Sequence, residues 1–234
     1  MLWIPITLAA AALQTARNAF QRGLTGALSP LGATYTRFAF GFPFAALYAA
    51  CVFASTGVPA PGIPFFAWVT LGGVAQILGT ASLMQLFRLR SFSTGIAFSK
   101  SEILQVALVG ILVLGDAVSM LAALAIGVAT VGLVLLSREP GAESWRDVAA
   151  GLFGRSALLG LATGAGFAVA AVAFRAASLS LGDPSFVASA AATLVAATLI
   201  QSVLMTGYLL WGEPGQIGVD APARAALRAA GAIV

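Results

Sequence analysis

Two ionisable residues, Lys100 and Glu102, stand inside a strongly apolar stretch that covers residues 94–137. Lys100 is the only lysine of the protein. A charged side chain inside a membrane-spanning helix is costly to desolvate, so such residues usually face a cavity or a charged partner. The stretch that carries these two residues is therefore the first candidate for a functional site.

The direction in which each side chain points follows from the helix expected over residues 94–114. In such a helix Glu102 lies about 3 Å along the axis from the centre. At about 100° per residue, Lys100 and Glu102 project in nearly opposite directions and cannot pair on one face of the helix. Glu102 shares its face with three residues whose types are common in cavity linings, namely Phe98, Ser101 and Gln105.

Two interpretations of Glu102 follow from this placement. In the first, the carboxylate binds a cationic or amine-bearing substrate, or a proton that is coupled to transport. In the second, Arg37 or Lys100 of the folded bundle holds Glu102 in a fixed ion pair that is purely structural.

A second polar face lies on the first apolar segment, where Gln14, Arg17, Asn18 and Gln21 follow the helical spacing i, i+3, i+4 and i+7. One interpretation is that these side chains line the same cavity as Glu102. The other is that the helix emerges into the lipid headgroups at this point, since Arg22 follows directly.

The composition predicts an all-α integral membrane protein. Of the 234 residues, 60% are hydrophobic and 9% are charged, whereas soluble domains have about 45–50% apolar and about 25% charged residues. Several apolar runs reach the length of about 20 residues that a helix needs to cross a bilayer. Membrane spans are expected at about 3–24, 31–54, 64–87, 94–114, 117–137, 155–179 and 184–210, with an eighth that begins near residue 223.

The same composition argues against several classes of site. The chain has no histidine and one cysteine, Cys51, so the commonest metal ligands are missing and no cofactor is expected. The arginines are scattered at the ends of apolar runs rather than gathered in a basic stripe, so no nucleic-acid partner is expected. No phosphate-binding loop of the P-loop type is present, so ATP is not expected to drive the protein directly.

A shift of the sequence by 154 residues aligns Phe20 with Phe174 and Pro30 with Pro184. The order of the apolar runs matches at this shift, which indicates two related halves of five spans each. The expected organisation is a first repeat at 1–137, a linker loop at 138–154 and a partial second repeat at 155–234. This partial repeat holds two full spans and the start of a third, so we expect the chain to be a fragment or a truncated gene product.

The fourth and fifth expected spans contain a short turn and glycines that can be compared with known families. The turn between them is Leu114-Gly115-Asp116, and the fifth span contains Gly127 and Gly132. With Arg37 early in the second span, this pattern resembles the EamA-like branch of the drug/metabolite transporter superfamily. Two features depart from that family: Ser101-Glu102-Ile103 stands where a proline is usual, and the acidic residue of the turn is aspartate rather than glutamate.

The resemblance implies ten helices in two five-helix inverted repeats, of which this chain would hold about three-quarters. From the chain as a whole we expect a bacterial inner-membrane permease that moves a small organic solute or metabolite by alternating access and has no enzymatic activity. Its partners would be the lipid bilayer and the solute, and whether it forms a homodimer stays open. The site residues expected for this function are Glu102, Lys100, Arg37, Ser101, Gln105, Gln14 and Asn18, in a central cavity lined by the first, fourth and sixth spans.

Two rival functions and the orientation stay open. The chain could be an intramembrane enzyme that acts on a lipid with Glu102, Lys100 and Asp116, or a non-catalytic scaffold subunit. The distribution of arginines between alternate connections puts the N-terminus outside the cell. The resemblance implies that the N-terminus is cytoplasmic.

Overall fold

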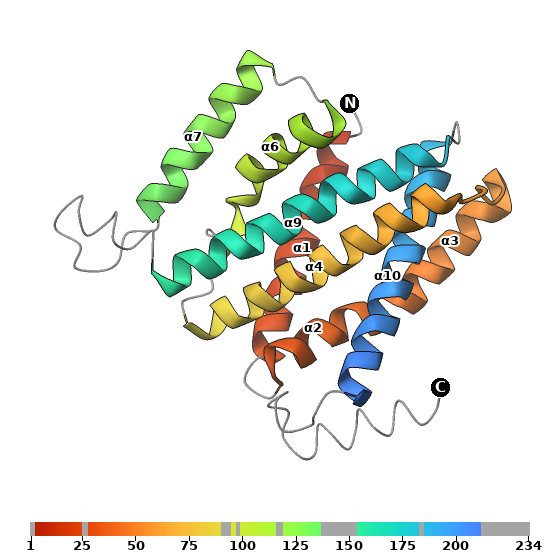
Figure 1. The fold of residues 1–234 in the computed structure, drawn as a ribbon, viewed down its shortest axis with the longest axis horizontal. Helices are drawn as coiled ribbons and strands as arrows, with labels where there is room; N and C mark the ends of the chain where they lie inside the picture. Colours follow the sequence, from red (N-terminus) through yellow and green to blue (C-terminus); the bar gives the residue numbers. More distant parts are fainter. Residues whose placement is uncertain are drawn as a thin grey trace.

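The computed structural model describes residues 3–24, 28–89, 95–96, 99–115, 119–136, 154–182 and 185–211. This part of the chain is all-α, as predicted, and contains no strand. Its helices are α1 (Trp3–Leu24), α2 (Pro30–Ala39), α3 (Phe42–Thr56), α4 (Ile63–Leu89), α6 (Glu102–Leu114), α7 (Met120–Leu136), α9 (Arg155–Ser180) and α10 (Phe186–Trp211) (Figure 1).

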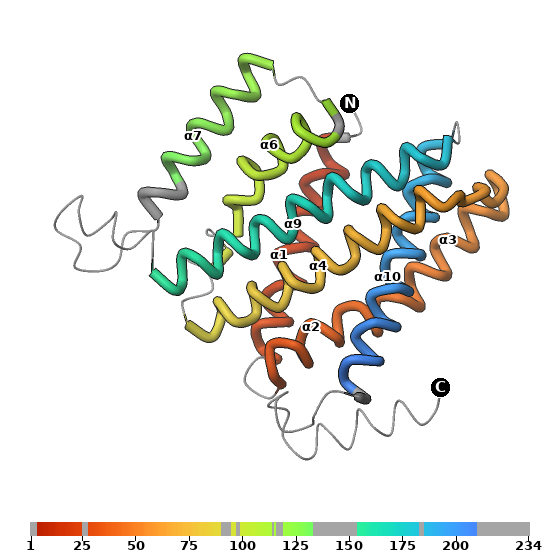
Figure 2. Tube along the Cα trace, viewed as in Figure 1, coloured from red at the N-terminus to blue at the C-terminus, as the bar shows by residue number. Residues whose placement is uncertain are grey.

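Helices α4 and α9 lie side by side at the centre of the molecule, although residues 90–154 separate them in the sequence. On one side, α6 packs against α9 and α7 contacts α6. On the other side, α10 packs against α4, α3 and α2 (Figure 2). Helix α1 contacts α2 and α4. The central pair therefore connects the two sides of the bundle.

Glycine allows α4 and α9 to approach each other closely. A Cβ atom added at Gly166 of α9 would lie 2.7 Å from the carbonyl oxygen of Ala75 and 2.7 Å from the Cα of Gly79. A Cβ added at Gly72 would lie 2.6 Å from Cε1 of Phe174. Small residues of this kind support helix association in lipid, where packing rather than the hydrophobic effect holds helices together.

The packed interior is apolar on both sides of this contact. Phe65 and Val69 of α4 are buried together with Ala177 of α9 and Ala197 of α10. A second cluster joins α2 to α4 through Ala33, Leu83, Met84 and Phe87. These clusters fix the positions of α2 and α10 relative to the central pair.

Four segments among the described residues are long and apolar enough to cross a membrane, namely Pro30–Thr56, Ile63–Leu89, Arg155–Ser180 and Phe186–Leu209. They correspond to the second, third, sixth and seventh expected spans. The apolar helices α6 and α7 are shorter. Large apolar side chains such as Leu78 and Leu112 are exposed on the outside of the bundle, which is the surface character of a membrane protein.

The second expected span is bent. Helix α2 ends at Ala39 and α3 begins at Phe42, with Pro43 in the first turn of α3. Proline lacks a backbone N–H, and its ring clashes with the carbonyl group four residues earlier, so it kinks a continuing helix. The kink lies just after Arg37, which stands in the last turn of α2.

The fourth expected span is interrupted near its start. Gly95, Ile96 and Ser99 are helical, Lys100 and Ser101 form a turn, and the regular helix α6 begins at Glu102. Its end is as expected, because Gly115 adopts a left-handed conformation (φ 68°) and caps the helix. Asp116, the expected linker up to residue 153, Pro184 and the expected third span of the second repeat lie outside the described residues.

The close contact of α4 with α9 predicts that Gly166→Ala destabilises the protein. The new methyl group would overlap the backbone of Ala75 and Gly79, and overpacking of this kind costs about 1–3 kcal/mol. Thermal unfolding in detergent micelles should show a lower midpoint for this variant. Gly127→Ala is the matched control, since nothing lies within 4 Å of the position of its Cβ; an equal loss in both variants would contradict the predicted role of this contact.

Candidate functional site

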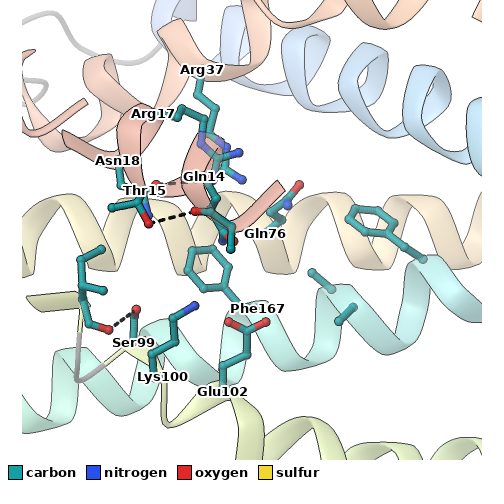
Figure 3. A pocket seen from close by; sticks show the side chains of 15 residues that line it. Gln14, Thr15, Arg17, Asn18, Arg37, Gln76, Ser99, Lys100, Glu102 and Phe167 are labelled. Carbon is teal, nitrogen blue, oxygen red and sulfur yellow. Dashed lines mark hydrogen bonds between the residues drawn. The ribbon is translucent and has the colours of Figure 1, made fainter. Parts of the chain in front are cut away.

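A polar cavity of about 260 Å³ lies between α1, α2, α4, α9 and the chain around the start of α6 (Figure 3). The first, fourth and sixth expected spans all contribute to it, and the second and third contribute one residue each. Its polar lining residues are Gln14, Thr15, Arg17, Asn18, Arg37, Gln76, Ser99, Lys100 and Glu102. A group of this polarity in an otherwise apolar bundle is the best candidate site in the part of the chain that the structure describes.

Arg37 is held in place by two contacts beside the cavity. Its Nη1 donates a hydrogen bond to Oγ1 of Thr80 on α4 at 3.1 Å. Its guanidinium carbon lies 5.4 Å from the centre of the Phe38 ring, within the range of a cation–π interaction. Thr80 accepts only one of the N–H groups of the guanidinium, so the others remain available to a solute or to water.

Arg17 of α1 lies next to Arg37 at the same end of the cavity (Figure 3). The two guanidinium groups are close enough to repel each other. Arg17 Nη2 donates to Oδ1 of Asn18 at 3.4 Å, a long hydrogen bond, and its Nε is buried with no partner among the described residues. This end of the cavity therefore presents two neighbouring positive charges with unused donors.

Lys100 and Glu102 line the other side of the cavity and point into it together (Figure 3). The expectation that the two side chains point apart was wrong. Lys100 lies in the turn before α6 rather than on the helix, so the spacing of about 100° per residue does not apply to it. No ion pair joins Glu102 to Lys100 or Arg37 in the described structure, although the charge of Lys100 is close enough to influence the carboxyl group.

Ser101 and Gln105 do not share the face of Glu102. Gln105 Nε2 donates to Ser101 Oγ at 3.2 Å and to the carbonyl oxygen of Leu161 on α9 at 3.3 Å. Both side chains line a different and mostly apolar cavity of about 500 Å³ between α6, α7 and α9. Gly164 of α9 lies against Ser101, so this pair fastens the start of α6 to α9. Phe98, expected on the same face, lies outside the described residues.

The polar face of α1 divides in two. Gln14, Arg17 and Asn18 line the polar cavity with Arg37, Lys100 and Glu102. Gln21 is buried one turn further along, where its Nε2 donates to the carbonyl oxygen of Ala33 at 3.3 Å. The structure thus brings five of the seven predicted site residues to one cavity and leaves Ser101 and Gln105 outside it.

Gln76, Phe167 and Phe174 line the cavity but were not among the predicted site residues. Phe167 and Phe174 are seven residues apart, which places them on the same side of a helix, and they interrupt a segment composed mainly of glycine and alanine. From this spacing the sequence could have indicated that Phe167 and Phe174 lie on the same side of the helix. Nothing in the sequence around Gln76 distinguishes it from the other glutamines within apolar runs.

Gln76 and Phe174 also line a third cavity, of about 360 Å³, between α4, α9 and α10. They therefore lie in the wall between this cavity and the polar one. Gln201 of α10 reinforces the wall, because its Nε2 donates to Oε1 of Gln76 at 2.6 Å and to the carbonyl oxygen of Gly73 at 3.3 Å. The single glutamines Gln76 and Gln201 thus form the interhelical hydrogen bond that polar residues commonly make between apolar helices.

Comparison with known proteins adds no assignment to this geometry. No protein-family model, no curated protein and no solved structure matches the chain. Within the described residues, no group of three histidine, cysteine or acidic side chains could hold a metal ion. The chemistry of the site must therefore be argued from the cavity itself.

The cavity should be reachable by water-soluble reagents. In a Cys51→Ala background, which removes the exposed native thiol, Ala171→Cys places a thiol in the lining. We expect it to react with the anionic reagent 2-sulfonatoethyl methanethiosulfonate, because reaction needs a thiolate and thiolates form in water. Mass spectrometry measures the modified fraction.

The matched control for this labelling is Leu78→Cys, which faces outward near the middle of α4. In membranes this thiol should stay unmodified, because lipid does not support a thiolate. Equal labelling of the two positions would contradict the assignment of a water-accessible cavity inside an apolar exterior.

Proposed function

We propose that the protein is a membrane permease that moves a small organic solute through the polar cavity by alternating access. The observation that supports this function best is a cavity lined by charged side chains from separate helices within a bundle of membrane-spanning length. Charged residues at such positions are rare and commonly mark a substrate or ion pathway. A volume of about 260 Å³ suits a small metabolite better than a drug-sized molecule.

The proposed path runs between the polar cavity and the neighbouring cavity on α10. Gln76 and Phe174 separate the two spaces, and the hydrogen bond from Gln201 to Gln76 joins α10 to α4 at this wall. A change in the packing of α10 against α4 would break this hydrogen bond and open the wall. Alternating access requires a barrier of this kind on one side of the site at a time.

The proposal includes membership of the EamA-like family, an organisation in two related repeats, and a place in a bacterial inner membrane. The turn at Leu114-Gly115 and the presence of Arg37 at the cavity support the family. The repeat is supported by the order of helices, since a long apolar span, Pro30–Thr56 or Phe186–Leu209, follows each of α1 and α9.

Transport through the cavity can be blocked and restored in one protein. Proteoliposomes that contain the Cys51→Ala, Ala171→Cys variant should take up at least one solute from a panel of amino acids, organic acids, nucleosides and organic amines. Modification with 2-sulfonatoethyl methanethiosulfonate should stop this uptake because the attached group fills the cavity. Dithiothreitol should restore it.

The Leu78→Cys variant, treated in the same way, should keep its uptake. An enzyme or a scaffold subunit would give no protein-dependent uptake of any solute before modification. Uptake that persists after complete modification of residue 171 would contradict the cavity as the transport path.

A further inference from the structure

Within the part of the chain that the structure describes, the charges that line the polar cavity do not balance. Arg17, Arg37 and Lys100 are basic, and Glu102 is the single acidic side chain. Lys100 and Glu102 lie on the same side and interact, so each offsets the charge of the other. The excess positive charge is therefore concentrated at the end formed by Arg17 and Arg37.

Two neighbouring guanidinium groups in an apolar bundle are stabilised by an anionic partner. They repel each other, and charges removed from bulk water are stable only when they are paired and hydrogen-bonded. Among the described residues, Asn18 and Thr80 are the only acceptors for the two side chains, and both are neutral. The buried Nε of Arg17 has no acceptor at all in this part of the chain.

The remaining walls suit the carbon body of a small solute. Phe167 lies between the arginine end and the side of Lys100 and Glu102 (Figure 3). Phe174 and the small residues Ala170 and Ala171 of α9 continue this apolar surface. A ligand that combines an anionic group with an apolar body would match both parts of the cavity.

We propose that the cavity binds a small organic anion whose charged group lies between Arg17 and Arg37 and whose apolar part lies against Phe167. Planar guanidinium groups bind carboxylates and phosphates through paired N–H donors, so either anion can fill this place. The proposal rests on the proposed function in treating the cavity as the solute site. It replaces the cationic or amine-bearing substrate expected from Glu102 alone.

Binding to the full chain in uncharged detergent tests this inference without requiring transport. The radiolabelled probes share a phenyl group and differ in charge: 3-phenylpropanoate, phenyl phosphate, neutral 3-phenylpropanamide and cationic 2-phenylethylamine. Equilibrium dialysis should show that at least one of the two anions binds about tenfold or more tightly than the amide and the amine. The ratio of the affinities for 3-phenylpropanoate and phenyl phosphate distinguishes a carboxylate site from a phosphate site.

Removal of the charge of Arg37 should weaken binding of the preferred anion. Arg37→Gln is expected to lower its affinity about 10- to 100-fold, the effect of losing charge-assisted hydrogen bonds. Arg155→Gln is the control, because Arg155 is exposed at the start of α9 and does not line the cavity. The affinity of this variant for the preferred anion should stay within about twofold of that of the wild type.

Glu102→Gln gives a result that misfolding cannot imitate. It removes the carboxylate that offsets Lys100, so the preferred anion should bind about two- to fivefold more tightly. The amine-binding hypothesis predicts the opposite, a loss of 2-phenylethylamine binding in this variant. Tighter binding of the amine than of both anions, or an anion affinity unchanged by Arg37→Gln, would overturn the proposal.

The outcomes separate this inference from the permease proposal. If uptake is blocked at residue 171 but only neutral or cationic probes bind, the permease stands and the anion is wrong. If the anions bind as expected but no solute is taken up, the anion site stands and the permease is wrong.

Discussion

The close approach of α4 and α9 is the contact on which the rest of the described structure depends. Gly166 brings the backbone of α9 against Ala75 and Gly79, a distance that any side chain at residue 166 would prevent. This contact fixes the rotation of α9, so Phe167 and Phe174 face the cavity while Gly164 receives the start of α6. In lipid, where apolar surfaces alone do not drive helices together, such backbone proximity is a principal source of specificity. The site is therefore built on packing first and on polar groups second.

Polar side chains from several elements line one of the cavities that this packing leaves. Each neighbouring element supplies a few: the polar face of α1, Arg37 before the kink at Pro43, and the turn before α6 that carries Lys100. Hydrogen bonds to uncharged partners, such as that from Arg37 to Thr80, hold the side chains without cancelling their charge. A bundle that only needed stability would gain little from this arrangement, because uncompensated charge within an apolar setting is destabilising. The positive end of the cavity is better explained as a binding feature.

Sequence patterns predicted the helices well and the directions of side chains less well. The span expected at 64–87 is α4, Ile63–Leu89, because uninterrupted apolar length is a strong signal. The start of α6 was not predictable, since no proline marks a boundary within residues 94–101 and Ser101 forms no side-chain cap. That error misplaced Lys100 and Ser101, which lie in a turn. Gln105 lies three residues after Glu102 on α6 itself, and the two side chains line different cavities. For Phe167 the sequence offered only its spacing from Phe174, because α9 is apolar on all sides and its own periodicity does not reveal which face meets α4.

Solid-state NMR in lipid bilayers tests the central claim most directly. The protein would be labelled with ¹⁵N in its arginine side chains, and the bound 3-phenylpropanoate with ¹³C in its carboxylate. The account predicts dipolar dephasing between the carboxylate carbon and guanidinium nitrogens, with the signal of the Arg17 and Arg37 pair identified by its loss in Arg17→Lys and Arg37→Lys variants. A bound carboxylate that shows no dephasing from arginine, but does so from a ¹⁵N-labelled Lys100, would contradict it.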